Sequence, residues 1–249
     1  MLRPRAVLAP NASPMTMAGT VTYIVGRDRA VVIDPGSTAP AHLDAIAAAL
    51  PPEATVRILL THGHPDHSDG ARELARRLDA RVFSLGTGTL RDGSVVPTDE
   101  GDLIALATPG HALDHLAFHW PAAAAVFCGD LMMGGLDTAL VAAPDGDLGQ
   151  YLASLERLRS LTPETIYPAH GPAFTDAAAA IGRYLEHRAE RERQVLAAIA
   201  GGARDVRQIT EVVYGHFLDP ALRTYAEGAV RAYVAHLVAT DRVPDEVSE

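Results

Sequence analysis

The chain has 249 residues, 48% of them hydrophobic, which predicts one large globular domain or one domain with a small appendage. Its net charge is −10 and all 21 basic residues are arginine, so the basic surface typical of nucleic-acid-binding proteins is not indicated. No apolar run is long enough to cross a membrane, the N-terminus lacks the apolar core of a signal peptide, and the single cysteine, Cys128, excludes an internal disulfide, so we expect a cytoplasmic protein.

Short apolar runs between glycine- and proline-rich turns predict a series of strands in the first 180 residues. In chain order these are 20–25, 30–34, 55–60, 81–85, 103–108, 116–120, 125–128 and 165–167. Helices are predicted at 41–50, from Ser68 or Asp69 to Leu78, and at 148–161. Strands and helices mixed in this order indicate sheets covered by helices, an α/β (α+β) architecture in layers.

The character of the chain changes to helical near Asp176. Helices are predicted at 181–199, 209–214 and 222–238, and we divide the chain into a catalytic domain of residues 1–180 and a small helical domain of residues 181–249. A DNA-reading helix should present Arg, Lys, Asn or Gln to base edges, whereas the last helix offers only Arg223 and Arg231, opposed by Glu227. A lid or dimer surface is therefore favoured for this part, and a nucleic-acid-binding regulator is the alternative.

The most informative segment is Thr-His-Gly-His-Pro-Asp-His, residues 61–67. His62 and His64 project to one side of an extended segment, because alternate residues share a face. Asp66 and His67 follow a bend at Pro65 and can face a second point in space. Imidazole nitrogen and carboxylate oxygen are suitable ligands for Zn²⁺ and similar divalent ions. The segment therefore predicts the beginning of two metal sites.

Three further candidate ligands follow predicted strands, each beside a glycine: His111 in Pro-Gly-His, Asp130 in Cys-Gly-Asp and His170 in Ala-His-Gly. Loops at one rim of a sheet would produce this repeated placement, and functional residues commonly gather on such loops. Five of the eleven histidines thus stand at candidate ligand positions. This number favours a metal site over histidines that merely satisfy loop hydrogen bonds.

His-x-His-x-Asp-His followed by Gly-His, Gly-Asp and Ala-His-Gly resembles the signature of the metallo-β-lactamase superfamily. The resemblance implies a four-layer αβ/βα sandwich with metal ions at one edge. It assigns His62, His64 and His111 to one ion, Asp66, His67 and His170 to a second, and Asp130 to both. Segments 19–23, 32–36 and 143–147 are similar to a subgroup that includes bacterial hydrolases and a β-lactamase-like endoribonuclease. That similarity implies a winged-helix-like C-terminal domain.

The predicted cofactors are two divalent ions, zinc in first place, with manganese or iron as alternatives. Two such ions lower the pKa of bound water towards ~7 and polarise the bond under attack. The hypothesis is that a bridging hydroxide attacks an electrophilic carbonyl or phosphorus. Asp66 is the predicted catalytic residue, which positions the hydroxide and passes a proton towards the leaving group.

Hydrolysis of a small ester or thioester is the first predicted function. Endoribonuclease activity on single-stranded RNA is the runner-up because of the subgroup resemblance, and an iron-dependent persulfide dioxygenase is a further alternative. The predicted partner is a small-molecule substrate, with a homodimer as a possible assembly.

Three further residues are candidates for supporting roles. Asp34 follows a strand and either accepts a hydrogen bond from a ligand imidazole or serves as a turn residue before Pro35. His115 either orients a ligand or is a satisfied strand histidine. Cys128 is predicted to be a buried packing residue, since free cysteines are usually buried.

Overall fold

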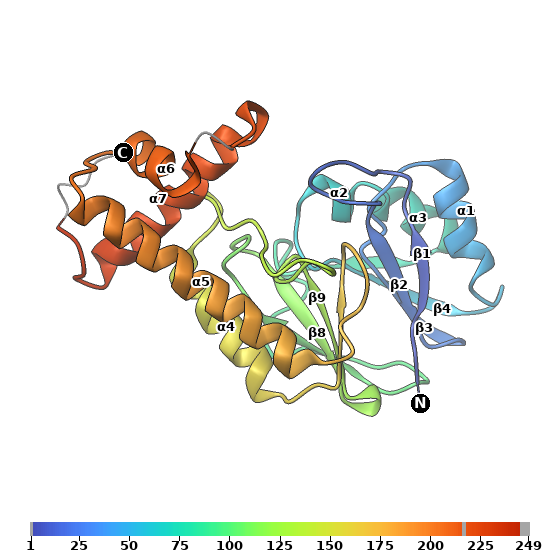
Figure 1. Ribbon diagram of the computed structural model, residues 1–249. Helices are drawn as coiled ribbons and strands as arrows, with labels where there is room; N and C mark the ends of the chain where they lie inside the picture. Colours follow the sequence, from blue (N-terminus) through green and yellow to red (C-terminus); the bar gives the residue numbers. More distant parts are fainter. Residues whose placement is uncertain (1, 216–217, 245–249) are drawn as a thin grey trace.

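The computed structural model describes residues 2–215 and 218–244, and its strands form two five-stranded sheets (Figure 1). The first sheet has the order β1-β2-β3-β4-β5, formed by Arg5–Leu8, Val21–Val25, Arg29–Ile33, Thr55–Leu59 and Arg81–Phe83. The second has the order β10-β9-β8-β7-β6, formed by Thr165–Pro168, Ala125–Gly129, Leu116–Trp120, Leu103–Ala107 and Val95–Val96. β3, β4 and β5 are parallel neighbours, as are β9 and β10.

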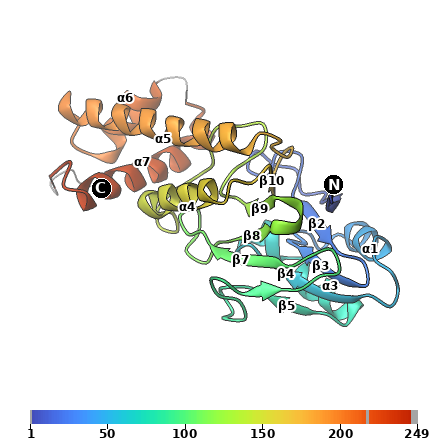
Figure 2. The same ribbon diagram turned by 90° about the horizontal axis from the view of Figure 1, so that it is seen from below.

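Helices cover the outer face of each sheet (Figure 2). The helices are α1 Pro40–Ala48, α2 Pro65–Ser68, α3 Ala71–Leu78, α4 Leu148–Ser160, α5 Ala177–Ala200, α6 Val206–Tyr214 and α7 Arg223–Ala239. Of these, α1 and α3 pack on the first sheet and α4 and α5 on the second, while α6 and α7 pack on other helices. Short 3₁₀ turns occur at Pro121–Ala123 and Pro220–Leu222. Among the described residues, no helix has the length and apolar character to cross a membrane. The arrangement of helix, sheet, sheet and helix is the four-layer sandwich that the resemblance to the metallo-β-lactamase superfamily implied.

Alternation along the strands explains the layers. Val31 and Ile33 of β3 face the second sheet and share a buried cluster with Phe118 and Phe127. Their neighbour Val32 points the other way, into a cluster with α1 and α3. Because successive side chains of a strand point to opposite faces, each central strand contributes to two apolar layers.

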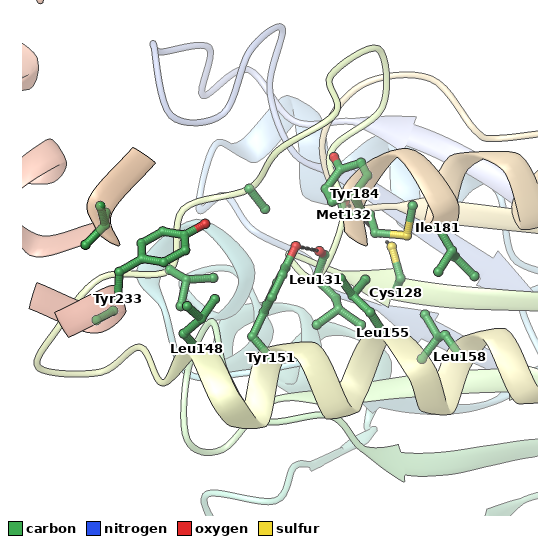
Figure 3. Packing of buried hydrophobic residues seen from close by; sticks show 14 of the residues in the cluster. Cys128, Leu131, Met132, Leu148, Tyr151, Leu155, Leu158, Ile181, Tyr184 and Tyr233 are labelled. Atoms are coloured by element: carbon green, nitrogen blue, oxygen red, sulfur yellow. Dashed lines mark hydrogen bonds between the residues drawn. The ribbon is translucent and has the colours of Figure 1, made fainter. Parts of the chain in front are cut away.

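The largest buried cluster joins the second sheet to the C-terminal helices (Figure 3). Val126 and Cys128 of β9 meet Tyr151 of α4, Ile181 of α5 and Tyr233 of α7 in this cluster. Helix α7 also packs against α5 and α6. The predicted boundary at residue 180 lies inside α5, and the division into two domains stays a prediction. Beyond Pro168 the described residues form no further strand, so the winged-helix-like character also stays a prediction.

Several elements differ from the expectation, including the short strand β6, which was not predicted, and α6, which begins three residues before the predicted helix at 209–214. The edge strand β1 was not predicted, because its alternating partial exposure carries little apolar signal. Helix α3 begins at Ala71 rather than at Ser68 or Asp69, because Pro65 starts a separate short helix there. Helix α5 begins at Ala177, four residues earlier than predicted, because the Asp176 side chain accepts a hydrogen bond from Ala179 N and caps it.

Candidate metal centre

All seven predicted ligands lie together at one edge of the two sheets. The segment from His62 to His67 follows β4, and Asp130 directly follows β9. His170 comes two residues after β10, and His111 lies in the loop between β7 and β8. Parallel pairing of β9 with β10 brings their carboxyl ends to the same edge, which explains why Asp130 and His170 meet.

The first group of potential ligands is His62, His64 and His111, whose ring nitrogens lie within 4.8 Å of one another. His62 Nε2 lies 2.9 Å from His64 Nδ1, and His111 Nε2 lies 3.2 Å from the same atom. Three ring nitrogens that converge in this way can offer their lone pairs to one cation.

The second group is Asp66, His67, Asp130 and His170, again with ligand atoms within 4.8 Å of one another. His67 Nε2 and His170 Nε2 each lie 3.3 Å from Asp130 Oδ1. These three buried atoms have no hydrogen-bond partner, although buried polar atoms nearly always have one. Three orphaned atoms that face one point fit a bound cation.

Asp130 connects the two groups. Its Oδ1 faces the second group, while its Oδ2 lies 3.6 Å from His111 Nε2 of the first group. One carboxylate can therefore contact both sites.

The outer nitrogens of the imidazoles are held by protein oxygens. His67 Nδ1 donates to Asp34 Oδ2 over 2.9 Å, and His111 Nδ1 donates to the Leu140 carbonyl over 2.8 Å. The Thr61 hydroxyl accepts from His62 Nδ1 and donates to Asp34 Oδ2. Hydrogen bonds of this kind fix the ring tautomer and leave the inner nitrogen free as a ligand.

The carboxylates make the second group attractive to positive charge. Burial lowers the pKa of His170, but the carboxylates of Asp130 and Asp66, each 3.3 Å from its Nε2, outweigh burial and raise that pKa to about 9. Burial likewise opposes charge on Asp130, yet His67 and His170 hold the pKa of its carboxyl well below the usual value. A potential that favours protons on these rings also favours a divalent cation in their place.

The two supporting candidates both contact the ligand residues. Asp34 holds His67 as described, and it also accepts hydrogen bonds from the Thr61 backbone N–H and hydroxyl. His115 is fully buried, so it lies out of reach of a product; its Nε2 accepts from the Asp130 backbone N–H over 3.2 Å, and its Nδ1 donates to Thr108. Burial lowers the pKa of His115 to about 3, which agrees with a neutral ring that accepts at Nε2.

Glycines make room for this arrangement at two ligands. Gly129 has φ +50°, and a Cβ there would lie 2.6 Å from His115 Nε2. Gly110 has φ +134°, and a Cβ there would lie 2.3 Å from the Tyr151 Cα. Any other residue at these positions would combine backbone strain with a clash.

A pocket of about 250 Å³ opens beside His64 and His111. Its other walls are the loop residues 140 and 142–145 and three residues of α7: Thr224, Tyr225 and Gly228. The loop is tied to α7, because Ala143 N donates to the Gly228 carbonyl. The C-terminal helix is therefore part of the wall of the site.

Sequence reasoning missed three contributors: the hydroxyls of Thr61 and Thr108, and the Leu140 carbonyl. Thr61 could have been predicted from the sequence, since it directly precedes the motif at the end of a strand. A backbone carbonyl from a distant loop leaves no trace in the sequence.

Comparison with known proteins agrees with this geometry. A profile described as "Metallo-beta-lactamase superfamily" matches residues 16–87 and 84–170. The chain is 33% identical to an atrochrysone carboxyl ACP thioesterase of Aspergillus terreus, over an alignment that covers 90% of this chain and 76% of that protein. Among solved structures, the metallo-beta-lactamase family protein TTHA1429 of Thermus thermophilus superimposes with a TM-score of 0.77 at 21% identity and covers 96% of this chain and 94% of its own.

A second solved structure, TTHA1623 in a di-iron-bound form, shows 30% identity and a TM-score of 0.52, and covers 75% of this chain and 98% of its own. The profile match and the identity to the thioesterase establish the relationship by sequence, while the likeness to TTHA1429 shows the shared fold. The chain belongs to the metallo-β-lactamase superfamily of metal-dependent hydrolases.

Proposed function

We propose that the protein holds two divalent metal ions and hydrolyses a thioester whose acyl group has an apolar body. The observation that carries this proposal is the convergence of the two ligand groups, with Asp130 facing both, beside a pocket. The three orphaned atoms of the second group support it, because a cation would complete their coordination.

Zinc is the proposed ion, since imidazole-rich sites suit it and it binds more tightly than manganese or iron in the usual order of divalent affinities. The solved di-iron form of TTHA1623 makes iron the alternative occupant. When bound, such ions lower the pKa of water and polarise the bond under attack.

Asp66 is the proposed catalytic residue. Its side chain is 30% exposed, the most open of the carboxylates in the second group, and His170 Nε2 lies 3.3 Å from its Oδ2. Burial would raise the pKa of Asp66, but His170 and His67 lower it, so the carboxylate is ionised and can accept a proton. The carboxylate can then hold that proton near the leaving group.

The pocket favours a thioester over RNA. Its lining residues, all within the described part of the chain, include no arginine and do include Asp145, which would repel a phosphate backbone. Ala142, Ala143 and Pro144 give it an apolar wall suited to an acyl group. The Aspergillus terreus relative is named as a thioesterase that acts on an acyl carrier protein, which points to the same chemistry.

The experiment is a panel of acyl thioesters, lactones and single-stranded RNA, assayed with metal-loaded protein and with its Asp66→Asn variant. We expect thiol release from thioesters, lost after chelation and restored by added metal, and lower by about a hundredfold or more in the variant. Cleavage of RNA with no thioester turnover would overturn the proposal. Oxygen consumption with one bound iron would also overturn it.

Location and assembly complete the proposal. The free thiol of Cys128 is buried and needs no oxidising compartment, which supports the cytoplasm as the site of action. A homodimer stays a prediction that light scattering tests.

A further inference from the structure

A second cavity, of about 320 Å³, adjoins the metal pocket. It lies between the loop around Leu136–Val141 and helices α5 and α7, and it shares Leu140 and Tyr225 with the metal pocket. Its volume is at the lower end of the range of about 300–1,000 Å³ that is typical of small-molecule sites. We call it the acyl cavity.

Exposed apolar side chains gather around this cavity. Met15, Leu136, Leu222 and Tyr225 all line it, and they are 38%, 41%, 41% and 45% exposed, respectively. They come from three separate segments of the chain, so their meeting is a property of the fold. Apolar surface that three segments expose at one place marks a ligand or partner site.

Arg188 of α5 lines the same cavity and is only 4% exposed. Its guanidinium donates to the Ala139 carbonyl and lies over the Tyr151 ring, with Cζ 4.7 Å from the ring centroid. Within residues 2–215 and 218–244, no carboxylate lies within ion-pair distance of it. A buried guanidinium stays charged, and burial without a counter-charge is costly.

Buried polar atoms without a hydrogen-bond partner indicate where a bound ligand or ion would supply one. Apart from His42 Nδ1, the buried side-chain atoms that have no hydrogen-bond partner in the described part of the chain fall into two sets. One set is the three atoms of the second ligand group, and the other is His187 Nδ1, Arg188 Nε and Tyr233 Oη. His187 lines the acyl cavity beside Arg188, and Tyr233 belongs to the buried cluster with Tyr151 (Figure 3). Tyr233 does not line the cavity, so the first set and the two cavity-lining residues of the second, His187 and Arg188, are the ones that mark places where a ligand would bind.

Further positive charge lies close by. Arg191 also lines the cavity, with its guanidinium 4.4 Å from the Tyr214 ring centroid. Burial, Arg188 and Arg191 lower the pKa of His187, so its ring is neutral at neutral pH. Apolar walls and two guanidinium groups in one cavity suit a ligand with an apolar body and an anionic oxygen.

We propose that the acyl cavity binds the acyl group of the substrate, and that Arg188 binds an anionic oxygen, such as a carboxylate, at the end of that group remote from the thioester. The inference rests on the proposed function for the thioester itself. The recognition of an acidic acyl group is a separate claim, and it can be tested without turnover.

The test measures binding of non-hydrolysable amides to the metal-loaded protein by calorimetry. Monoamides of dicarboxylic acids from glutaric to suberic acid are compared with the neutral amides of the same carbon number, up to octanamide. We expect the acidic member of at least one pair to bind about tenfold to a hundredfold more tightly. Arg188→Met should remove this preference, while Arg193→Met, an exposed position on the same helix, should keep it.

A purely structural role for Arg188 gives a different result. Arg188→Met would then weaken both members of each pair equally and lower the melting temperature. That result, or equal binding of every acidic and neutral pair to the wild type, overturns the inference. If the monoamide preference appears but no thioester is hydrolysed, the proposed function fails and the inference on the acyl cavity stands.

Discussion

Asp34 Oδ2 lies 2.9 Å from His67 Nδ1, so a carboxylate outside the ligand set fixes the orientation of a buried ligand imidazole. The same carboxylate binds the backbone N–H and hydroxyl of Thr61, the residue before the His-x-His-x-Asp-His motif. Asp34 thereby joins the end of β3 to the loop that carries four of the seven candidate ligands.

Asp34→Ala should weaken metal binding at the second group by about 10-fold to 100-fold, the usual cost of losing a partner of a metal-binding histidine. Competition with a chromophoric chelator measures this affinity. Asp44→Ala is the matched control, because Asp44 makes only a surface ion pair with Arg77. Unchanged affinity in the Asp34 variant would show that His67 does not depend on this contact.

His115→Phe should reduce both stability and metal content. The ring would no longer accept the Asp130 backbone N–H, and a buried donor left without a partner costs about 1–3 kcal/mol. Because Asp130 faces both ligand groups, we expect lower occupancy at both. Urea unfolding and metal analysis test the two effects. Full metal content with reduced stability would restrict His115 to a packing role.

Gly228→Val should impair thioester turnover although Gly228 is not one of the candidate metal ligands. A Cβ at Gly228 would lie 3.0 Å from the Ala142 Cβ, so a larger side chain would displace the loop that bonds His111 through Leu140. Misplacement of about 1 Å can cost up to about 100-fold in rate. Steady-state kinetics measures the loss, with Gly182→Val on α5 as the control, since a Cβ there meets nothing within 4 Å. Equal kinetics for both variants would contradict a role for α7 in the site.

His42 should make stability depend on pH. Burial lowers the pKa of His42 below 6.5, so below pH 6.5 the unfolded chain takes up a proton that the folded chain does not. Stability is then full above that pH and falls below it, by at most about 1.4 kcal/mol for each pH unit. His42→Gln keeps a donor for the Thr22 hydroxyl and does not titrate.

We therefore expect chelated wild-type protein to lose more stability than chelated His42→Gln protein between pH ~7 and ~5, measured by urea unfolding. Parallel losses in the two proteins would show that His42 is not the group responsible.

Spacing along the chain was enough to predict the layered fold and the seven candidate ligands, which the fold does bring together. His62, Asp66 and Asp130 follow strands, and strand ends that share a sheet edge must meet. The Leu140 carbonyl and the wall formed by α7 could not be predicted, because they depend on how a loop and a helix distant in sequence pack against the site. The sequence around Arg188 carries no signal that sets it apart from the other arginines, and only its burial without a carboxylate distinguishes it.

The central claim is that metal ions occupy the two ligand groups and are required for hydrolysis. Elemental analysis of purified wild-type, His64→Ala and His170→Ala proteins, paired with thioester assays, tests it most directly. We predict one divalent ion for each of the two groups in the wild type, with a loss of metal and of activity in each variant. A wild-type protein that hydrolyses thioesters at full rate with no bound metal would contradict the account.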